Sequence, residues 1–265
     1  MKRSKRRESR RQEIREMNFH QTREEHQAAT FKAAPPLQPK NQLQAEYIHA
    51  INCRPYVLCS GLAGVGKTYI AGRLAARELK GKEIERIVLI RPAASASKSL
   101  GYFKGTVEEK MKSWLAPIMG ALQDEFSPSE IAYMMKEGVD RLICQPLETV
   151  KGNSWKNAFV IVDEAEDCTI KELKSLMTRL GTNSTMVICG DVTQVDIKRS
   201  GMYDLLEAMK RSPILNDAIS HIAFEDYEDI IRSRAVRDIV EGFDEADGIR
   251  LGLVEKSCND YHDWA

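Results

Sequence analysis

A glycine-rich run near residue 61 contains the residue types that bind a triphosphate. Gly61-Leu-Ala-Gly-Val-Gly-Lys67-Thr68 fits the pattern G-x-x-x-x-G-K-S/T. The glycines allow backbone N–H groups to turn toward an anion without a Cβ in the way, and a helix N-terminus adds its positive dipole end. The run therefore predicts a phosphate-binding loop (P-loop) for ATP, in which Lys67 reaches the β and γ phosphates and the Thr68 hydroxyl is a ligand of Mg²⁺.

Two adjacent carboxylates follow a strongly apolar run further along the chain. Ala158-Phe-Val-Ile-Val precedes Asp163 and Glu164, which is a Walker-B pattern. Ligand sites in open α/β sheets lie at the carboxyl ends of the strands. We therefore predict that Asp163 holds Mg²⁺ and that Glu164 polarises the water that attacks the γ phosphate.

Two glutamines complete the set of candidate site residues. Gln194 follows the apolar run Thr185–Gly190 and Asp191, so it is predicted to sense the γ phosphate or to orient water. Gln44 lies near the start of a predicted helix over 41–51, where its amide can pair with adenine N6 and N7. Gln42 is the second choice for that contact.

The elements that position these residues alternate along the chain. Strands are expected at 56–59, 86–92, 141–145, 158–162, 185–190 and 219–224, and helices at 41–51, after the P-loop, 107–123, 129–136, after Glu164, 202–209 and 229–240. This alternation over 54–240 predicts an α/β fold, with one mostly parallel sheet and helices on both faces. The expected organisation is a basic helical or disordered arm (1–36), a P-loop ATPase domain (37–241) and an acidic tail (242–265).

Composition and charge favour a cytoplasmic protein with a basic arm. The net charge is zero, but residues 1–16 carry eight basic and three acidic side chains. The arm either contacts nucleic acid or is a solvated tail. Neither a signal peptide nor a membrane-spanning run is recognisable, and the six cysteines lack C-x-x-C spacing, so we expect reduced thiols and no membrane partner.

A loop that mixes basic and aromatic residues is predicted between the second strand and the next helix. It spans residues 93–105 and contains Lys98, Tyr102, Phe103 and Lys104. Such a mixture suits single-stranded nucleic acid, whereas the alternative is that the aromatic residues anchor the loop on the core.

Taken together, these segments resemble the PhoH family of phosphate-starvation-inducible ATPases. The matching segments are GLAGVGKTY from 61, IVLIRPA from 87, LGYFKGTVEEKM from 100, FVIVDEAED from 159, GDVTQVD from 190 and DIIRSRAV from 229. The resemblance covers about residues 41–240. It implies a P-loop NTPase core of RecA and superfamily-1-helicase type, with a role on RNA or other nucleic acid.

The resemblance also assigns residues. It places nucleotide contacts along the first segment, at Gly61, Leu62, Ala63, Gly64, Val65, Gly66, Lys67, Thr68 and Tyr69. The family's arginine in the last segment falls on Arg232. Where the family carries Gln and Asn after its D-E-A, this chain has Glu166 and Asp167.

Three functions are compatible with these motifs. The first is an ATPase, helicase or translocase that depends on single-stranded nucleic acid. The second is a nucleotide-dependent assembly or switch ATPase without such a substrate. The third, a small-molecule kinase, uses the same loop but requires an acceptor site and lid arginines, and the paired Asp-Glu favours water as the nucleophile.

The sequence also suggests assembly into a homo-oligomeric ring. About 25 residues after the predicted core cannot form a second RecA-like domain, so a neighbouring subunit is expected to supply an arginine finger in trans. We expect a hexamer, with Arg232 as the finger and Arg234 and Arg237 as reserves. The alternative is that these arginines pair with Glu228, Asp229 or Asp238.

Overall fold

The fold is built on one sheet of six parallel strands. The computed structural model describes residues 31–92, 107–150, 152, 154–191 and 199–246. The strand order is β3-β2-β4-β5-β1-β6. The strands are β1 (Tyr56–Gly61), β2 (Arg86–Arg91), β3 (Leu142–Pro146), β4 (Ala158–Val162), β5 (Thr185–Gly190) and β6 (Ser220–Phe224).

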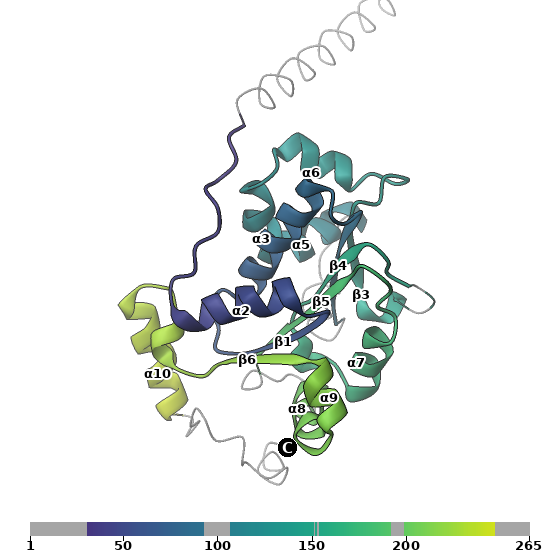
Figure 1. Ribbon diagram of the computed structural model, residues 1–265. Coiled ribbons are helices and arrows are strands. Elements are labelled where there is room, and N and C mark those ends of the chain that lie inside the picture. The colour runs from purple at the N-terminus through teal and green to yellow at the C-terminus, as the bar shows by residue number, and fades with distance from the viewer. Residues whose placement is uncertain (1–30, 93–106, 151, 153, 192–198, 247–265) are drawn as a thin grey trace, which may run out of the picture.

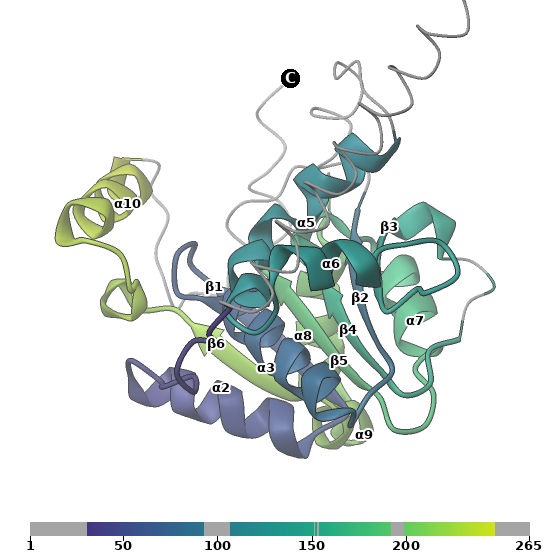
Figure 2. The same cartoon turned by 90° about the horizontal axis from the view of Figure 1, so that it is seen from above.

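Helices cover both faces of this sheet (Figures 1 and 2). The helices are α2 (Gln42–Cys53), α3 (Lys67–Gly81), α5 (Val107–Gln123), α6 (Pro128–Met134), α7 (Ile170–Met177), α8 (Gly201–Arg211), α9 (Pro213–Ala218) and α10 (Arg234–Ala246). Three short 3₁₀ turns lie at Leu147–Thr149, Ala165–Asp167 and Tyr227–Asp229.

Strand residues alternate between two apolar cores. Val57 and Cys59 pack with residues of α2, α3, α5 and α6, whereas Leu58 between them packs with residues of α7 and α8. The central strands are buried on both faces, which is why each appears in the sequence as a nearly continuous apolar run. The predicted parallel α/β fold with helices on both faces is confirmed.

The region after β6 differs from the prediction. A helix was expected over 229–240, but Ile230 is buried and the Ile231 N–H donates to the Gly64 carbonyl at 3.3 Å. Ile230 is extended after the 3₁₀ turn at Tyr227–Asp229, and α10 begins only at Arg234. The helix then continues to Ala246, past the expected domain boundary at 241. The short helix α9 was not predicted.

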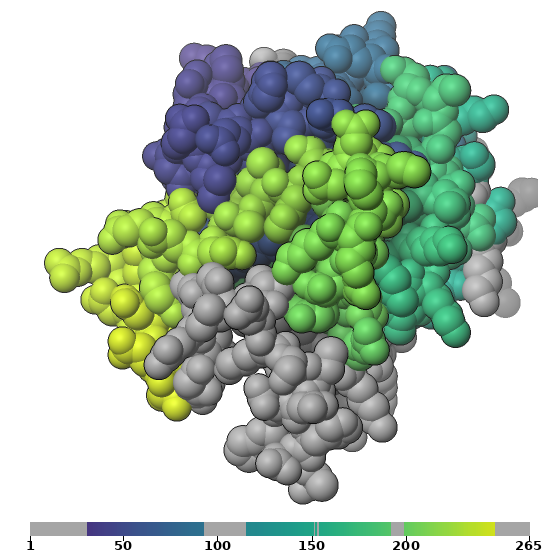
Figure 3. Space-filling model, turned by 60° about the horizontal axis from the view of Figure 1, so that its bottom comes forward, coloured from purple at the N-terminus to yellow at the C-terminus, as the bar shows by residue number. Residues whose placement is uncertain are grey.

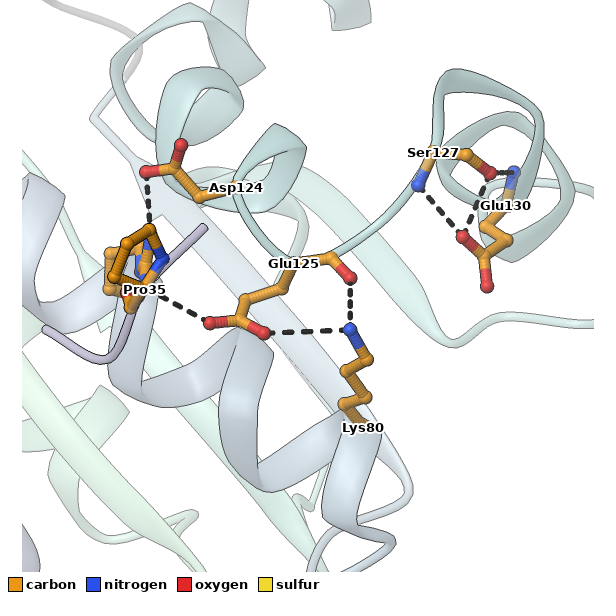
Figure 4. A network of polar contacts seen from close by, with 7 residues as sticks. Pro35, Lys80, Asp124, Glu125, Ser127 and Glu130 are labelled. Carbon is orange, nitrogen blue, oxygen red and sulfur yellow. Dashed lines mark hydrogen bonds and ion pairs between the residues drawn. The ribbon is translucent and has the colours of Figure 1, made fainter. Parts of the chain in front are cut away.

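An ion-pair network ties the segment before α2 to the domain (Figure 4). The buried guanidinium of Arg73 contacts Asp124 at 2.8 Å, Glu125 at 3.1 Å and the Pro35 carbonyl at 2.8 Å. Lys80 donates to the Glu125 carbonyl at 2.7 Å. The segment before α2 is therefore fixed to the domain at Pro35.

Two further expectations concern cysteines and membranes. Five cysteines lie in the described part of the chain; all are free, and four of them are buried. Over the described ranges, every helix is too short or too polar to cross a lipid bilayer.

Candidate nucleotide and magnesium site

The P-loop connects β1 to α3 and takes backbone conformations that favour glycine. Gly61 has φ +124°, and a Cβ at this position would lie 2.0 Å from the Phe224 carbonyl oxygen of β6. Gly64 and Gly66 also have positive φ, at +85° and +95°. The positive φ values favour glycine at all three positions, and at Gly61 the close approach of β6 excludes a side chain as well.

Lys67 is the first residue of α3, and its ammonium group folds over the loop. It donates to the Gly61 carbonyl at 2.6 Å and the Leu62 carbonyl at 2.8 Å. From α2, the buried Tyr47 hydroxyl donates to the Lys67 carbonyl at 3.1 Å. The lysine charge is thus held at the carboxyl end of β1, within the loop that the sequence identified.

Thr68 and Asp163 meet at the base of this loop. The Thr68 hydroxyl donates to Asp163 Oδ1 at 2.7 Å, and the Asp163 N–H donates to the Ile90 carbonyl at 2.9 Å. Asp163 is buried, with its backbone fixed to the neighbouring strand. A hydroxyl and a carboxylate side by side are oxygen ligands of the kind that Mg²⁺ prefers, so these two residues fit the predicted ion.

Arg91 is a site residue that the sequence analysis missed. Its guanidinium forms an ion pair with Glu164 Oε1, and its Nε lies 3.5 Å from Asp163 Oδ2. The sequence shows Arg91 at the end of an apolar run, but only the structure shows that β2 pairs directly with β4. A charged residue at the carboxyl end of a strand beside the Walker-B strand points toward its carboxylates.

A second buried carboxylate lies beside the Walker-B pair. Glu166 Oε2 accepts a hydrogen bond from the Asp191 N–H at 3.1 Å. A Cβ on Gly190 would lie 2.6 Å from the same oxygen, so the glycine makes room for the glutamate. Burial, together with the nearby carboxylates of Asp191 and Asp163, raises the pKa of Glu166 to about 7.

Gln44 also lies against the P-loop, but its amide is engaged by the chain. Its Nε2 donates to the Val65 carbonyl at 2.9 Å, and its Oε1 accepts from the Lys40 N–H at 2.9 Å. Only 2% of the residue is exposed. Gln42 pairs with Glu46 on the surface at 3.1 Å. Gln44 supports the loop in this structure, and its contact with adenine stays a prediction.

The segment before α10 also packs against the P-loop. A Cβ on Gly64 would lie 3.2 Å from Arg232 Cγ, so Arg232 packs over the P-loop of its own chain. Among the described residues, no carboxylate forms an ion pair with Arg232. Arg237 pairs with Glu228 at 2.5 Å and Arg234 lies 3.9 Å from Asp238, so the pairing alternative is confirmed for these two.

Some predicted residues lie away from the site or outside the described residues. The Tyr69 hydroxyl donates to Asp124 at 2.6 Å, next to the Arg73 network. The residues outside the described ranges are Gln194, the Lys98, Tyr102, Phe103 and Lys104 group, and the basic arm at 1–16.

Comparison with known proteins identifies the family. A family model described as PhoH-like protein matches residues 36–244. The chain belongs to the PhoH family. Within it, a PhoH-like protein of Mycobacterium tuberculosis is 36% identical over 207 residues, which cover 78% of this chain and 58% of the relative. A PhoH-like protein of Bacillus subtilis is 36% identical over 208 residues, covering 77% of this chain and 63% of the relative. This PhoH-family chain therefore spans about three fifths of these relatives.

The PhoH fold also has a counterpart among solved structures. A large terminase from a thermophilic bacteriophage superposes with a TM-score of 0.50 at 9% sequence identity, covering 77% of this chain and 50% of the terminase chain. With the P-loop between β1 and α3, these findings confirm the predicted P-loop NTPase fold of RecA type.

Proposed function

We propose that this PhoH-family chain binds ATP with Mg²⁺ and hydrolyses it. The observation that carries the proposal is the 2.7 Å hydrogen bond from Thr68 to Asp163, with Glu164 as the next residue after Asp163. It unites the last residue of the P-loop motif with the Walker-B carboxylate, so the two halves of a Mg²⁺-nucleotide site lie together.

Each residue then has a defined task. The P-loop N–H groups and Lys67 hold the phosphates, and Thr68 and Asp163 would hold Mg²⁺. When bound, the ion neutralises charge on the β and γ phosphate oxygens. Glu164 follows at the carboxyl end of β4 with 35% of its side chain exposed, so water reaches its carboxylate. Glu164 orients that water and accepts its proton.

The direct test is ATP turnover by the purified chain. Turnover should require Mg²⁺ and be abolished by EDTA, and Lys67→Ala should lose nucleotide binding or turnover. The matched control is Lys82→Ala, because Lys82 lies at the other end of the same helix. Equal turnover by wild type and Lys67→Ala would contradict the proposal.

Coupling to single-stranded nucleic acid is the second part of the proposal. It rests on the basic excess of residues 1–16 and on the basic and aromatic residues of 93–105. Turnover is compared with and without single-stranded RNA or DNA. Stimulation supports coupling, whereas the same rate with both polymers favours the assembly or switch ATPase. Deleting residues 1–16 should flatten the salt dependence of binding if the arm neutralises phosphates.

Assembly of several copies is the third part, with a hexameric ring as our first expectation. Figure 3 shows α10 at one side of the molecule. On this helix Val236, Ile239 and Phe243 are 39%, 59% and 67% exposed, at the spacing of one helix face. Such an apolar face favours association. Sedimentation with ATP and Mg²⁺ tests this part, and a monomer at full turnover would contradict it.

A further inference from the structure

Among the described residues, Arg91 is a cationic side chain that lies against both Walker-B carboxylates. We propose that Arg91 restrains Glu164 in a paired position that is unproductive for hydrolysis, so that the pair sets a low basal rate. The inference rests on the proposed ATPase function and adds a positioning residue to the same site.

Sheet register fixes Arg91 at this place. In the pairing of β2 with β4, Ile90 lies opposite Val162. The next residues along the two strands are therefore Arg91 and Asp163, and the Asp163 N–H donates to the Ile90 carbonyl at 2.9 Å. Because the backbone brings the two strand ends together, the guanidinium needs no long reach to meet the carboxylates.

Both partners of Arg91 in this site are carboxylates. The Arg91 side chain is 17% exposed, and its contacts are with Glu164 Oε1 and with Asp163 Oδ2 at 3.5 Å. A partly buried guanidinium between two carboxylates is neutralised by them, which suits a restraining contact better than a contact with a phosphate anion.

The ion pair opposes the chemistry that Glu164 has to perform. A general base needs a carboxylate oxygen that faces the attacking water. The guanidinium holds one carboxylate oxygen of Glu164 in the ion pair, so this oxygen faces Arg91 and not the attacking water. Removing the pair should therefore speed hydrolysis rather than slow it.

The backbone conformation of Glu164 is one that requires surrounding contacts to hold the residue in place. Its φ of 55° and ψ of 44° place it in the left-handed region, which is uncommon for a residue other than glycine. Such conformations persist where surrounding contacts hold them. The Arg91 pair is one such contact, and it acts on the side chain of the same residue.

The test compares Arg91→Ala and Arg91→Lys with wild type in steady-state ATP turnover without added polymer. We expect Arg91→Ala to raise kcat by about fivefold, the scale of a partly exposed ion pair, with KM changed less than about twofold. Arg91→Lys keeps the charge and should return kcat toward the wild-type value. The matched control is Arg86→Ala, because Arg86 begins the same strand and pairs with Glu85 at 3.4 Å. It should leave kcat unchanged.

Each outcome decides the matter. A kcat that falls or stays equal in Arg91→Ala, while wild type turns over, overturns the restraint and leaves the ATPase proposal standing. Turnover only in Arg91→Ala supports the restraint, and no turnover in either protein contradicts both proposals. If Arg91→Ala does not fold, as judged by its circular dichroism, Arg91→Met, which keeps the aliphatic stem, takes its place with the same expected rise.

Discussion

The hydroxyl of Thr68 donates a 2.7 Å hydrogen bond to Asp163, although 95 positions separate the two residues in the chain. Thr68 lies in the first turn of α3, and Asp163 follows the last residue of β4. The bond joins the P-loop to the strand that carries Glu164, the proposed hydrolytic carboxylate. Loss of either side chain should therefore change the Mg²⁺ requirement of ATP turnover more than it changes the fold.

The first prediction concerns this bond. Thr68→Val removes one of the two proposed Mg²⁺ ligands but keeps the side-chain shape. The Mg²⁺ concentration for half-maximal turnover should rise by about tenfold or more. Titration of ATP turnover with Mg²⁺ measures it. Thr178→Val is the control, because the Thr178 hydroxyl donates only to carbonyls of α7, at 3.0 and 3.1 Å. Equal Mg²⁺ requirements in all three proteins would remove Thr68 from the site.

The second prediction concerns the start of the P-loop. A Cβ in Gly61→Ala would lie 2.0 Å from the Phe224 carbonyl oxygen, at a φ of +124°. We expect a loss of about 3 kcal/mol or more in the free energy of unfolding, measured by urea denaturation. Gly120→Ala in α5 is the contrast, since nothing lies within 4 Å of its added Cβ. That variant should be more stable by about 0.5–1 kcal/mol. The idea fails if Gly61→Ala is as stable as wild type.

The strands and the P-loop were predictable because their signals are local. Each of the six strands is a short apolar run, and the P-loop is defined by eight consecutive residues. The partners of Gln44 and Arg91 were not predictable, because they depend on which strands and helices become neighbours. The late start of α10 has the same cause, since a hydrogen bond from Ile231 to Gly64 overrides the helical pattern. Helix α9 is only six residues long and has no buried residue, so its sequence shows no apolar helical periodicity from which it could be predicted.

The third prediction concerns Arg232. The sequence suggested a finger that acts on a neighbouring subunit, but Arg232 packs over Gly64 of its own chain. We now propose that it acts in cis on its own nucleotide. Arg232→Ala should lose most turnover, and mixing it with Lys67→Ala should restore none. Arg234→Ala is the control, because Arg234 is exposed beside Asp238. Recovery of activity on mixing would instead support the trans finger.

The fourth prediction concerns the pH dependence of stability. Burial raises the pKa of Glu166 to about 7, above its ordinary value, so the folded protein holds this proton more tightly than the unfolded chain. The contribution of protonated Glu166 to the free energy of unfolding is full below the ordinary carboxyl pKa. It is lost as the pH rises toward 7. Glu166→Gln stays neutral and keeps an oxygen for the Asp191 N–H.

Glu166→Gln should therefore match wild type near pH 5 and be more stable at pH 8, by about 1–3 kcal/mol. Urea denaturation of both proteins at the two pH values measures this difference, and the other titrating groups cancel in the comparison. A stability difference that does not change with pH would show that Glu166 is ionised in the folded protein throughout this range.

The measurement that tests the central claim most directly is a single-turnover comparison of wild type with Glu164→Gln. Both proteins are loaded with labelled ATP and Mg²⁺, and bound ATP and ADP are followed over time. If Glu164 accepts the proton of the attacking water, the variant should bind ATP with similar affinity and retain it unhydrolysed, because only the base is lost. Hydrolysis by Glu164→Gln at the wild-type rate would contradict the account.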